Sequence, residues 1–238
     1  MPAFADGSGN SPAEWPGVSF PWPPPPGEAE AVATEGPPLR LAVMASGDGS
    51  NFEALVAACR SAALAAEVVQ LVVNEPDCGA RGRAERLAIP WRLLDHRRFA
   101  SREALDGALI AAFHEVKADL VVMAGWMRIV TPVLINAFPG RLVNLHPSLL
   151  PSFRGRDGIG DALAAGVTLA GCTAHLVVPE VDAGPILVQA AVPVLPGDDR
   201  ESLHGRIRIQ EHRILPLAVR LAAERLGEGR SPRGGPQG

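Results

Sequence analysis

The sequence predicts an α/β fold in which a doubly wound, mostly parallel sheet is flanked by helices and ends in an antiparallel strand pair. Short apolar runs alternate with segments of helical periodicity from Leu39 onward, which is typical of βαβ units. Residues 119–125 (DLVVMAG) are apolar without alternation, as in parallel strands buried on both faces. After Gly171 two apolar runs, CTAHLVV and ILVQAAVPV, flank the loop PEVDAGP with no helical segment between them, which favours antiparallel pairing.

The predicted strands and helices alternate along the chain. Strands are expected over residues 39–46, 68–73, 91–94, 119–125, 172–178 and 186–194, and from Leu142 to about His146. Helices are expected over residues 52–64, 80–87 and about 200–225, and also after Ser101 and after Thr131. Ser101 is a preferred N-cap residue, Thr131 followed by Pro132 is suited to begin a helix, and Pro216 is expected to kink the last one.

Composition divides the 238 residues into three parts. Residues 1–38 hold ten of the 23 prolines, five acidic residues and no Lys or Arg, so this extension is expected to be disordered. Residues 39–226 are expected to form one folded domain, and residues 227–238 a flexible tail. The domain has equal numbers of acidic and basic residues, which argues against nucleic acid as a partner, because phosphate backbones require an excess of basic side chains.

The expected location is the cytoplasm. Cys59, Cys78 and Cys172 lack the spacing of metal ligands, and we expect them to be reduced thiols. No apolar run is long enough for a transmembrane helix, and the N-terminus lacks the basic and apolar segments of a signal peptide. We therefore expect no association with a membrane.

Two polar side chains interrupt the apolar stretch LVNLHPSLLP, residues 142–151. Asn144 and His146 are two apart, so they point to the same side of an extended chain. Pro147 ends the strand, which places an amide and an imidazole together at the carboxyl end, where open α/β sheets bind ligands. A histidine in such a run is often only a core residue, but Asn144 and His146 together can also be interpreted as catalytic residues. The amide can stabilise a carbonyl oxygen that gains charge, and the imidazole can move a proton.

The turn SGDGSN, residues 46–51, joins the first strand to the first helix. The amides of Gly49, Ser50 and Asn51 would lie at the N-terminus of that helix, where a phosphate is favoured. Two alternatives remain, a glycine turn without a ligand and a dinucleotide site. Phe52 replaces the third glycine of the dinucleotide fingerprint, although Glu75 follows the second strand about where a ribose-binding acid would stand.

The loop between the last two strands contains Asp182. An ordinary turn aspartate is one interpretation. The other is a carboxylate close to His146 that favours the charged imidazole. We expect no metal site, because no second His or Cys stands at ligand spacing. His175 could face either the site or the core, and His204 is expected to face solvent.

Together these pieces resemble the phosphoribosylglycinamide formyltransferases, folate-dependent enzymes of purine synthesis in the formyltransferase superfamily. The resemblance extends from about Leu39 to Arg225 and rests on SGDGSNFEAL, AGWMRIV, RLVNLHPSLLPSFRG, GCTAHLVVPEVDAGPILVQAAVPV and IQEHRILP. It implies the formyltransferase fold with a Rossmann-like N-terminal half. It also implies transfer of the formyl group of 10-formyltetrahydrofolate to the amine of 5-phosphoribosylglycinamide, with no metal and with a monomer or homodimer as the active form.

The resemblance also assigns roles to individual residues. Asn144, His146 and Asp182 would form the catalytic set. The substrate would be bound by Gly49, Ser50 and Asn51 at its phosphate and by Glu211 at its glycinamide part. The formyl donor would contact Asn144 and five further residues: Arg102, Met127, Arg128, Ile129 and Val130. Asp48 departs from expectation, because an acidic residue stands beside the proposed phosphate site.

Three alternatives are weaker. Methionyl-tRNA formyltransferases share the Asn-His-Asp chemistry but add an RNA-binding domain, for which this chain has neither the length nor the basic excess. Formyltetrahydrofolate deformylases carry an N-terminal ACT domain, and residues 1–38 are too short and proline-rich to supply one. A dinucleotide-binding reductase or a nucleotide-sensing protein would use the same glycine turn.

Overall fold

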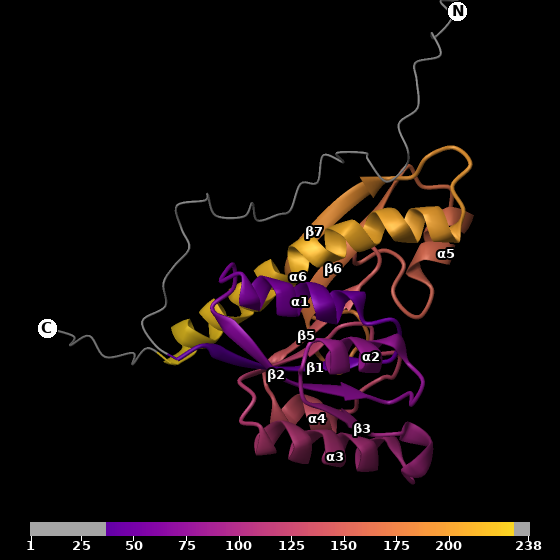
Figure 1. The fold of residues 1–238 in the computed structure, drawn as a ribbon. Coiled ribbons are helices and arrows are strands. Elements are labelled where there is room, and N and C mark those ends of the chain that lie inside the picture. Colours follow the sequence, from indigo (N-terminus) through magenta and orange to yellow (C-terminus); the bar gives the residue numbers. More distant parts are fainter. Residues whose placement is uncertain (1–36, 231–238) are drawn as a thin grey trace, which may run out of the picture.

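The computed structural model describes residues 37–230 and shows one seven-stranded sheet in the order β3-β2-β1-β4-β5-β6-β7 (Figure 1). The first five strands are parallel to one another. β6 pairs antiparallel with both β5 and β7, which confirms the predicted fold class. The strands are β1 (Leu39–Ala45), β2 (Ala66–Val73), β3 (Trp91–Leu93), β4 (Leu120–Met123), β5 (Leu142–His146), β6 (Leu169–Leu176) and β7 (Ile186–Pro193).

Helices cover both faces of the sheet. They are α1 (Ser50–Arg60), α2 (Gly79–Arg86), α3 (Arg102–Glu115), α4 (Pro132–Ala137), α5 (Gly158–Ala164) and α6 (Arg200–Arg230), with a short 3-10 helix, η2 (His96–Arg98). The larger of two apolar clusters joins the sheet to α1, α2, α5 and α6, and the smaller joins the opposite face to α3 and α4 (Figure 1). No helix within residues 37–230 is long and apolar enough to cross a membrane.

The predicted caps are confirmed. The side chain of Ser101 accepts a hydrogen bond from the Ala104 amide at the start of α3, and that of Thr131 accepts one from Val133 at the start of α4. These bonds satisfy amides that have no partner within their helix.

Two helices differ from the sequence expectation. α5 was not predicted, because its sequence GIGDALA contains two glycines and is too short to show a helical period. α6 contains Pro216 within its length and continues to Arg230, beyond the expected start of the tail at Gly227. The predicted disorder of residues 1–38 and flexibility of residues 227–238 fall largely on residues 1–36 and 231–238, which lie outside the described part of the chain.

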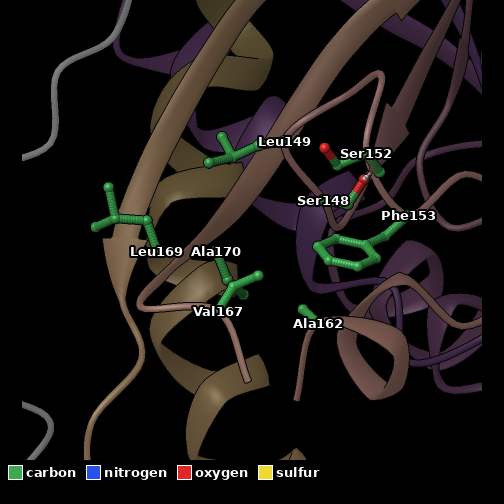
Figure 2. A pocket seen from close by; sticks show the side chains of 8 residues that line it. All are labelled: Ser148, Leu149, Ser152, Phe153, Ala162, Val167, Leu169 and Ala170. Atoms are coloured by element: carbon green, nitrogen blue, oxygen red, sulfur yellow. Dashed lines mark hydrogen bonds between the residues drawn. The ribbon is translucent and has the colours of Figure 1, made fainter. Parts of the chain in front are cut away.

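A buried polar network fixes the chain after β5. Thr173 Oγ1 donates to the Ser148 carbonyl at 2.7 Å and accepts from the Leu150 amide at 3.1 Å. Gln189 on β7 donates to both Thr173 Oγ1 and the Leu150 carbonyl at 2.9 Å. A cavity of about 140 Å³ lies beside this turn. Figure 2 shows the side chains that line it, which are apolar except for Ser148 and Ser152. The network holds the end of β5 where it meets β6.

A buried ion pair joins the start of α6 to the loop after β7. Arg206 and Asp198 are 2.8 Å apart, and their side chains are 6% and 5% exposed. The Arg206 guanidinium holds the pKa of Asp198 at about 2. Because this pKa lies below its ordinary value of 3.8, the pair stabilises the fold above pH 4, and the effect is lost as the pH falls towards 2.

Asp198→Asn is therefore expected to lower the free energy of unfolding by about 2 kcal/mol at pH 7, and by about half as much at pH 3. Urea unfolding of both proteins at the two pH values measures this difference. Asp161→Asn, a change of a carboxylate near the surface of α5, is the control. A loss that does not depend on pH would contradict the assignment.

Candidate active site

A cavity of about 720 Å³ lies at the carboxyl edge of the sheet. Its wall is formed by the turn after β1, the segment after β4, the end of β5, the loop between β6 and β7, and the first turns of α6. All the site residues named from the sequence lie on this wall: Gly49, Ser50, Asn51, Arg102, Met127, Arg128, Ile129, Val130, Asn144, His146, Asp182 and Glu211. Because ligands of open α/β sheets bind at this edge, the cavity is the candidate active site.

The centre of the cavity joins an amide, two imidazoles and a carboxylate. Asp182 Oδ2 lies 3.5 Å from His146 Nδ1, and Asp182 Oδ1 lies 3.5 Å from His175 Nε2. Asn144 Nδ2 lies 3.1 Å from His175 Nε2 and 3.4 Å from Asp182 Oδ1. The predicted proximity of Asn144, His146 and Asp182 is therefore present, and His175 is a fourth member that faces the site.

Both ring nitrogens of His146 have an acceptor within reach. Nε2 lies 2.9 Å from the carbonyl oxygen of Phe153, which can only accept a hydrogen bond. Nδ1 faces the carboxylate of Asp182. An imidazolium can donate to both groups at once, so this arrangement suits the protonated form of His146.

His175 orients the amide of Asn144. Its Nδ1 lies 2.9 Å from the Leu176 carbonyl oxygen, which can only accept, so Nδ1 carries a proton, and its Nε2 faces both Asn144 Nδ2 and Asp182 Oδ1. An amide nitrogen carries two hydrogens, and Asn144 Nδ2 also donates to Asp182 Oδ1 at 3.4 Å, a long contact that a ligand oxygen can replace. Asn144 can therefore serve as a positioned donor.

The loop between β6 and β7 presents Asp182 in a left-handed conformation, with φ of 51°. A Cβ on Gly184 would lie 1.7 Å from the Leu176 carbonyl oxygen, so only glycine lets the loop pack against the end of β6. Burial raises the pKa of Asp182, but the contacts with His175, the Gly155 amide and the charge of His146 outweigh it and lower the pKa below its ordinary value. Asp182 is thus held as a carboxylate.

The glycine turn supplies the second part of the site. Gly49 has φ of 81° and is the N-cap of α1, without a side-chain cap. The first amides of a helix have no partner within it, and Ser50 and Asn51 place theirs at the cavity wall. An anion fits this position, since the positive end of the helix dipole lies there.

Glu211 on α6 closes the same end of the cavity. It is 5% exposed and accepts a hydrogen bond from Asn51 Nδ2 at 2.9 Å. Burial raises the pKa of Glu211, and Asn51 and Arg208 only partly offset this. A buried acid with one neutral donor is well placed to accept a further hydrogen bond from an amide or amine of a ligand.

A further part of the cavity wall is apolar and basic. Met127 and Ile129 are 65% and 56% exposed, although both are large and apolar. Arg102 and Arg128 line the same cavity. An apolar surface next to guanidinium groups suits an aromatic ligand that carries carboxylates.

Several residues of the site were missed from the sequence. Arg156, Arg200, His204 and Arg208 line the cavity, and His204 is partly buried, so its predicted exposure to solvent was wrong. Three of them had a usable signal, because Arg208, His204 and Arg200 precede Glu211 by three, seven and eleven positions on one helix and so share its face. Arg156 lies in a loop, where the sequence does not indicate the direction of the side chain.

Glu75 is not on the cavity wall. It pairs with His96 at 3.7 Å and with Arg97 at 3.4 Å, so its carboxylate is engaged away from the glycine turn. This weighs against the dinucleotide alternative. Within residues 37–230 no group of three or more His, Cys, Asp or Glu side chains is placed to hold a metal ion.

The chain is similar to known formyltransferases. The formyl transferase family model matches residues 39–219. Phosphoribosylglycinamide formyltransferase of Mycobacterium tuberculosis is 46% identical over 185 residues, which are 76% of this chain and 84% of that protein. The crystal structure of glycinamide ribonucleotide transformylase 1 from Symbiobacterium toebii has a TM-score of 0.78 and 43% identity, and the match covers 80% of this chain and 90% of that one.

A larger relative shares the same segment. The trifunctional purine biosynthetic protein adenosine-3 of Bos taurus is 41% identical over 192 residues, which are 79% of this chain but only 19% of that protein. The chain therefore spans about a fifth of the trifunctional relatives that it matches. The family model and the full-length bacterial relative agree, and the chain belongs to the formyl transferase family, in its phosphoribosylglycinamide formyltransferase branch.

Proposed function

We propose that the chain transfers the formyl group of 10-formyltetrahydrofolate to the amine of 5-phosphoribosylglycinamide, giving formylglycinamide ribonucleotide and tetrahydrofolate in purine synthesis. The observation that carries the proposal is one cavity with three chemically distinct parts. Helix amides and Glu211 suit a phosphorylated glycinamide, an apolar and basic part of the wall suits a folate, and Asn144 and His146 line the same cavity.

The reaction places charge on one oxygen. As the substrate amine attacks the formyl carbon, negative charge develops on the formyl oxygen, and the amide N–H of Asn144 and the imidazolium of His146 stabilise it. His146 or a water molecule then passes the proton from the amine to the folate nitrogen, the bond between that nitrogen and the formyl carbon breaks as the carbonyl re-forms, and tetrahydrofolate leaves. Asp182 keeps the imidazolium available. These groups supply the charge stabilisation and proton transfer without a metal ion.

Placement of both substrates in one cavity supplies a further part of the rate. Holding two reactants in a reactive orientation is worth about 7–11 kcal/mol in favourable cases. The glycine turn follows β1, and the segment with Met127 and Ile129 follows the neighbouring strand β4. Both line the cavity with Asn144 and His146 of β5, so each can fix one reactant next to these residues.

Formyl transfer in vitro tests the function. The purified chain is incubated with 10-formyltetrahydrofolate, with and without glycinamide ribonucleotide, and tetrahydrofolate formation is followed by absorbance. We expect turnover that depends on the glycinamide substrate. Equal rates with and without it would indicate hydrolysis and contradict the proposal. In a thermal unfolding assay, a folate analogue should stabilise the protein and NAD(P) should not.

The phosphate of the substrate is expected to contribute strongly to binding. A glycinamide riboside without the 5′-phosphate should bind on the order of 100-fold more weakly, because it forms no charge-assisted hydrogen bonds with the amides of Ser50 and Asn51. Isothermal titration calorimetry with both compounds measures the ratio. Equal affinities would remove the glycine turn from the site.

We also propose a cytoplasmic location and a monomer or homodimer, with small molecules rather than nucleic acid as ligands. Cys59, Cys78 and Cys172 are free thiols, which fits a reducing compartment. Burial raises the pKa of the Cys59 thiol to about 11, so it is not a reactive thiolate near neutral pH.

A further inference from the structure

The phosphate turn, residues 46–51, is attached to helix α2 by its backbone. The Ala80 amide donates to the Gly47 carbonyl at 3.0 Å. A Cβ on Gly49 would lie 2.6 Å from the Cα of Ala80, so the missing side chain lets the helix approach. Arg83, one helical turn later, donates from Nε to the Asp48 carbonyl at 2.8 Å. The position of the turn therefore depends on α2.

Arg83 also neutralises the carboxylate of Asp48. Its Nη2 donates to Oδ1 at 2.9 Å and to Oδ2 at 2.8 Å, and its Nη1 pairs with Glu53 of α1. The Asp48 side chain is 59% exposed and the residue lies on the cavity wall, whereas Arg83 is 28% exposed. The hydrogen bond with Asp48 is the main cause of the raised pKa of Arg83.

An unpaired carboxylate at this position would oppose phosphate binding. Asp48 directly precedes Gly49, whose neighbours present the helix amides, so its charge acts on the same anion that the amides attract. This is the residue that the sequence alone left unexplained. The pairing with Arg83 explains how the acidic Asp48 can stand beside a phosphate.

We propose that Arg83 is a positioning residue of the phosphate site, in addition to the residues assigned above; this rests on the proposed function. It holds the backbone of Asp48 so that the following amides face the cavity, and it cancels the charge of the Asp48 side chain. It acts through Asp48 and does not itself line the cavity.

Arg83→Gln tests the proposal. The KM for glycinamide ribonucleotide is expected to rise about tenfold, because the partly exposed carboxylate then repels the phosphate, while kcat and the KM for the formyl donor stay unchanged. Adding Asp48→Asn to this variant should restore the KM to within about threefold of wild type, since the repelling charge is gone. Arg86→Gln is the matched control. Arg86 lies on the same helix as Arg83 and also pairs with Glu53, but it makes no contact with the phosphate turn.

An unchanged KM in Arg83→Gln would overturn the proposal. A raised KM that Asp48→Asn does not restore would also overturn it, because a general loss of structure would then be the cause. Should Arg83→Gln fail to fold, Arg83→Lys replaces it. An ammonium group can pair with the carboxylate but cannot also hold the carbonyl, and we expect about a threefold rise in KM, with no rise as the contradicting result.

Binding of ribose 5-phosphate, measured by calorimetry, separates this proposal from the proposed function. If the wild-type chain binds ribose 5-phosphate, Arg83→Gln weakens that binding and no formyl transfer occurs, the function fails and the role of Arg83 stands. If the wild-type chain transfers formyl groups and Arg83→Gln binds ribose 5-phosphate as well as wild type does, the function stands and the role of Arg83 fails.

Discussion

His146→Ala is expected to lower kcat for formyl transfer about 1,000-fold while the protein remains folded. The imidazole is 7% exposed, faces Asp182 with one nitrogen and the Phe153 carbonyl with the other, and lies on the cavity wall. Its loss removes both the positive charge next to the formyl oxygen and the proton carrier. The substrates are bound mainly by other residues, so their KM values should change little.

Single-turnover kinetics of His146→Ala measures the chemical step directly, and circular dichroism with a thermal melt reports on the fold. His114→Ala is the matched control, because this imidazole stacks on Phe138 on an exposed position of α3 and does not line the cavity. A turnover rate of His146→Ala within about threefold of wild type would remove His146 from the reaction.

Two parts of the site could be predicted from local sequence, and the first lies on one strand. Asn144 and His146 share a side because the two-residue period of a strand fixes it, and Pro147 marks the strand end. The glycine turn was likewise recognisable between an apolar run and a helical pattern. Rules based on the period of a strand or helix work at these places because the backbone is regular and the sequence marks where the element ends.

Other residues depend on tertiary contacts. Asp182 comes from a loop 36 residues after His146, so local sequence left two interpretations open, a turn aspartate and a carboxylate near His146, and the resemblance to a family favoured the second. His175 was ambiguous because Ala170 to His175 are buried on both faces of β6, so no alternation in the sequence indicates its direction. The structure resolves it, since His175 is the register partner of Asn144.

The secondary structure shows the same contrast between features predictable from local sequence and features set by tertiary contacts. The parallel strands were recognisable because burial on both faces gives unbroken apolar runs, and α5 was not, because two glycines and seven residues carry no period. The direction of Asp48 could not be read from the turn itself. It is set by Arg83, which lies 35 residues later on a neighbouring helix.

Asp182→Asn is expected to lower kcat about 100-fold to 1,000-fold. The carboxylate lies 3.5 Å from both His146 and His175 and accepts the Gly155 amide at 2.9 Å. Asparagine keeps the shape, tolerates the left-handed backbone and can still accept the amide of Gly155. The substitution therefore removes the charge and leaves the loop in place.

The matched control is Glu85→Gln, which removes an exposed carboxylate from a surface pair with Arg81. Comparison of Asp182→Asn, His146→Ala and the double variant then separates two routes of action. If Asp182 acts by holding the imidazolium, the double variant should lose no more than about twofold beyond His146→Ala alone, because the group that it serves is already absent. Multiplied losses would instead show that Asp182 acts through His175 and the amide of Asn144, and would contradict the role proposed for it.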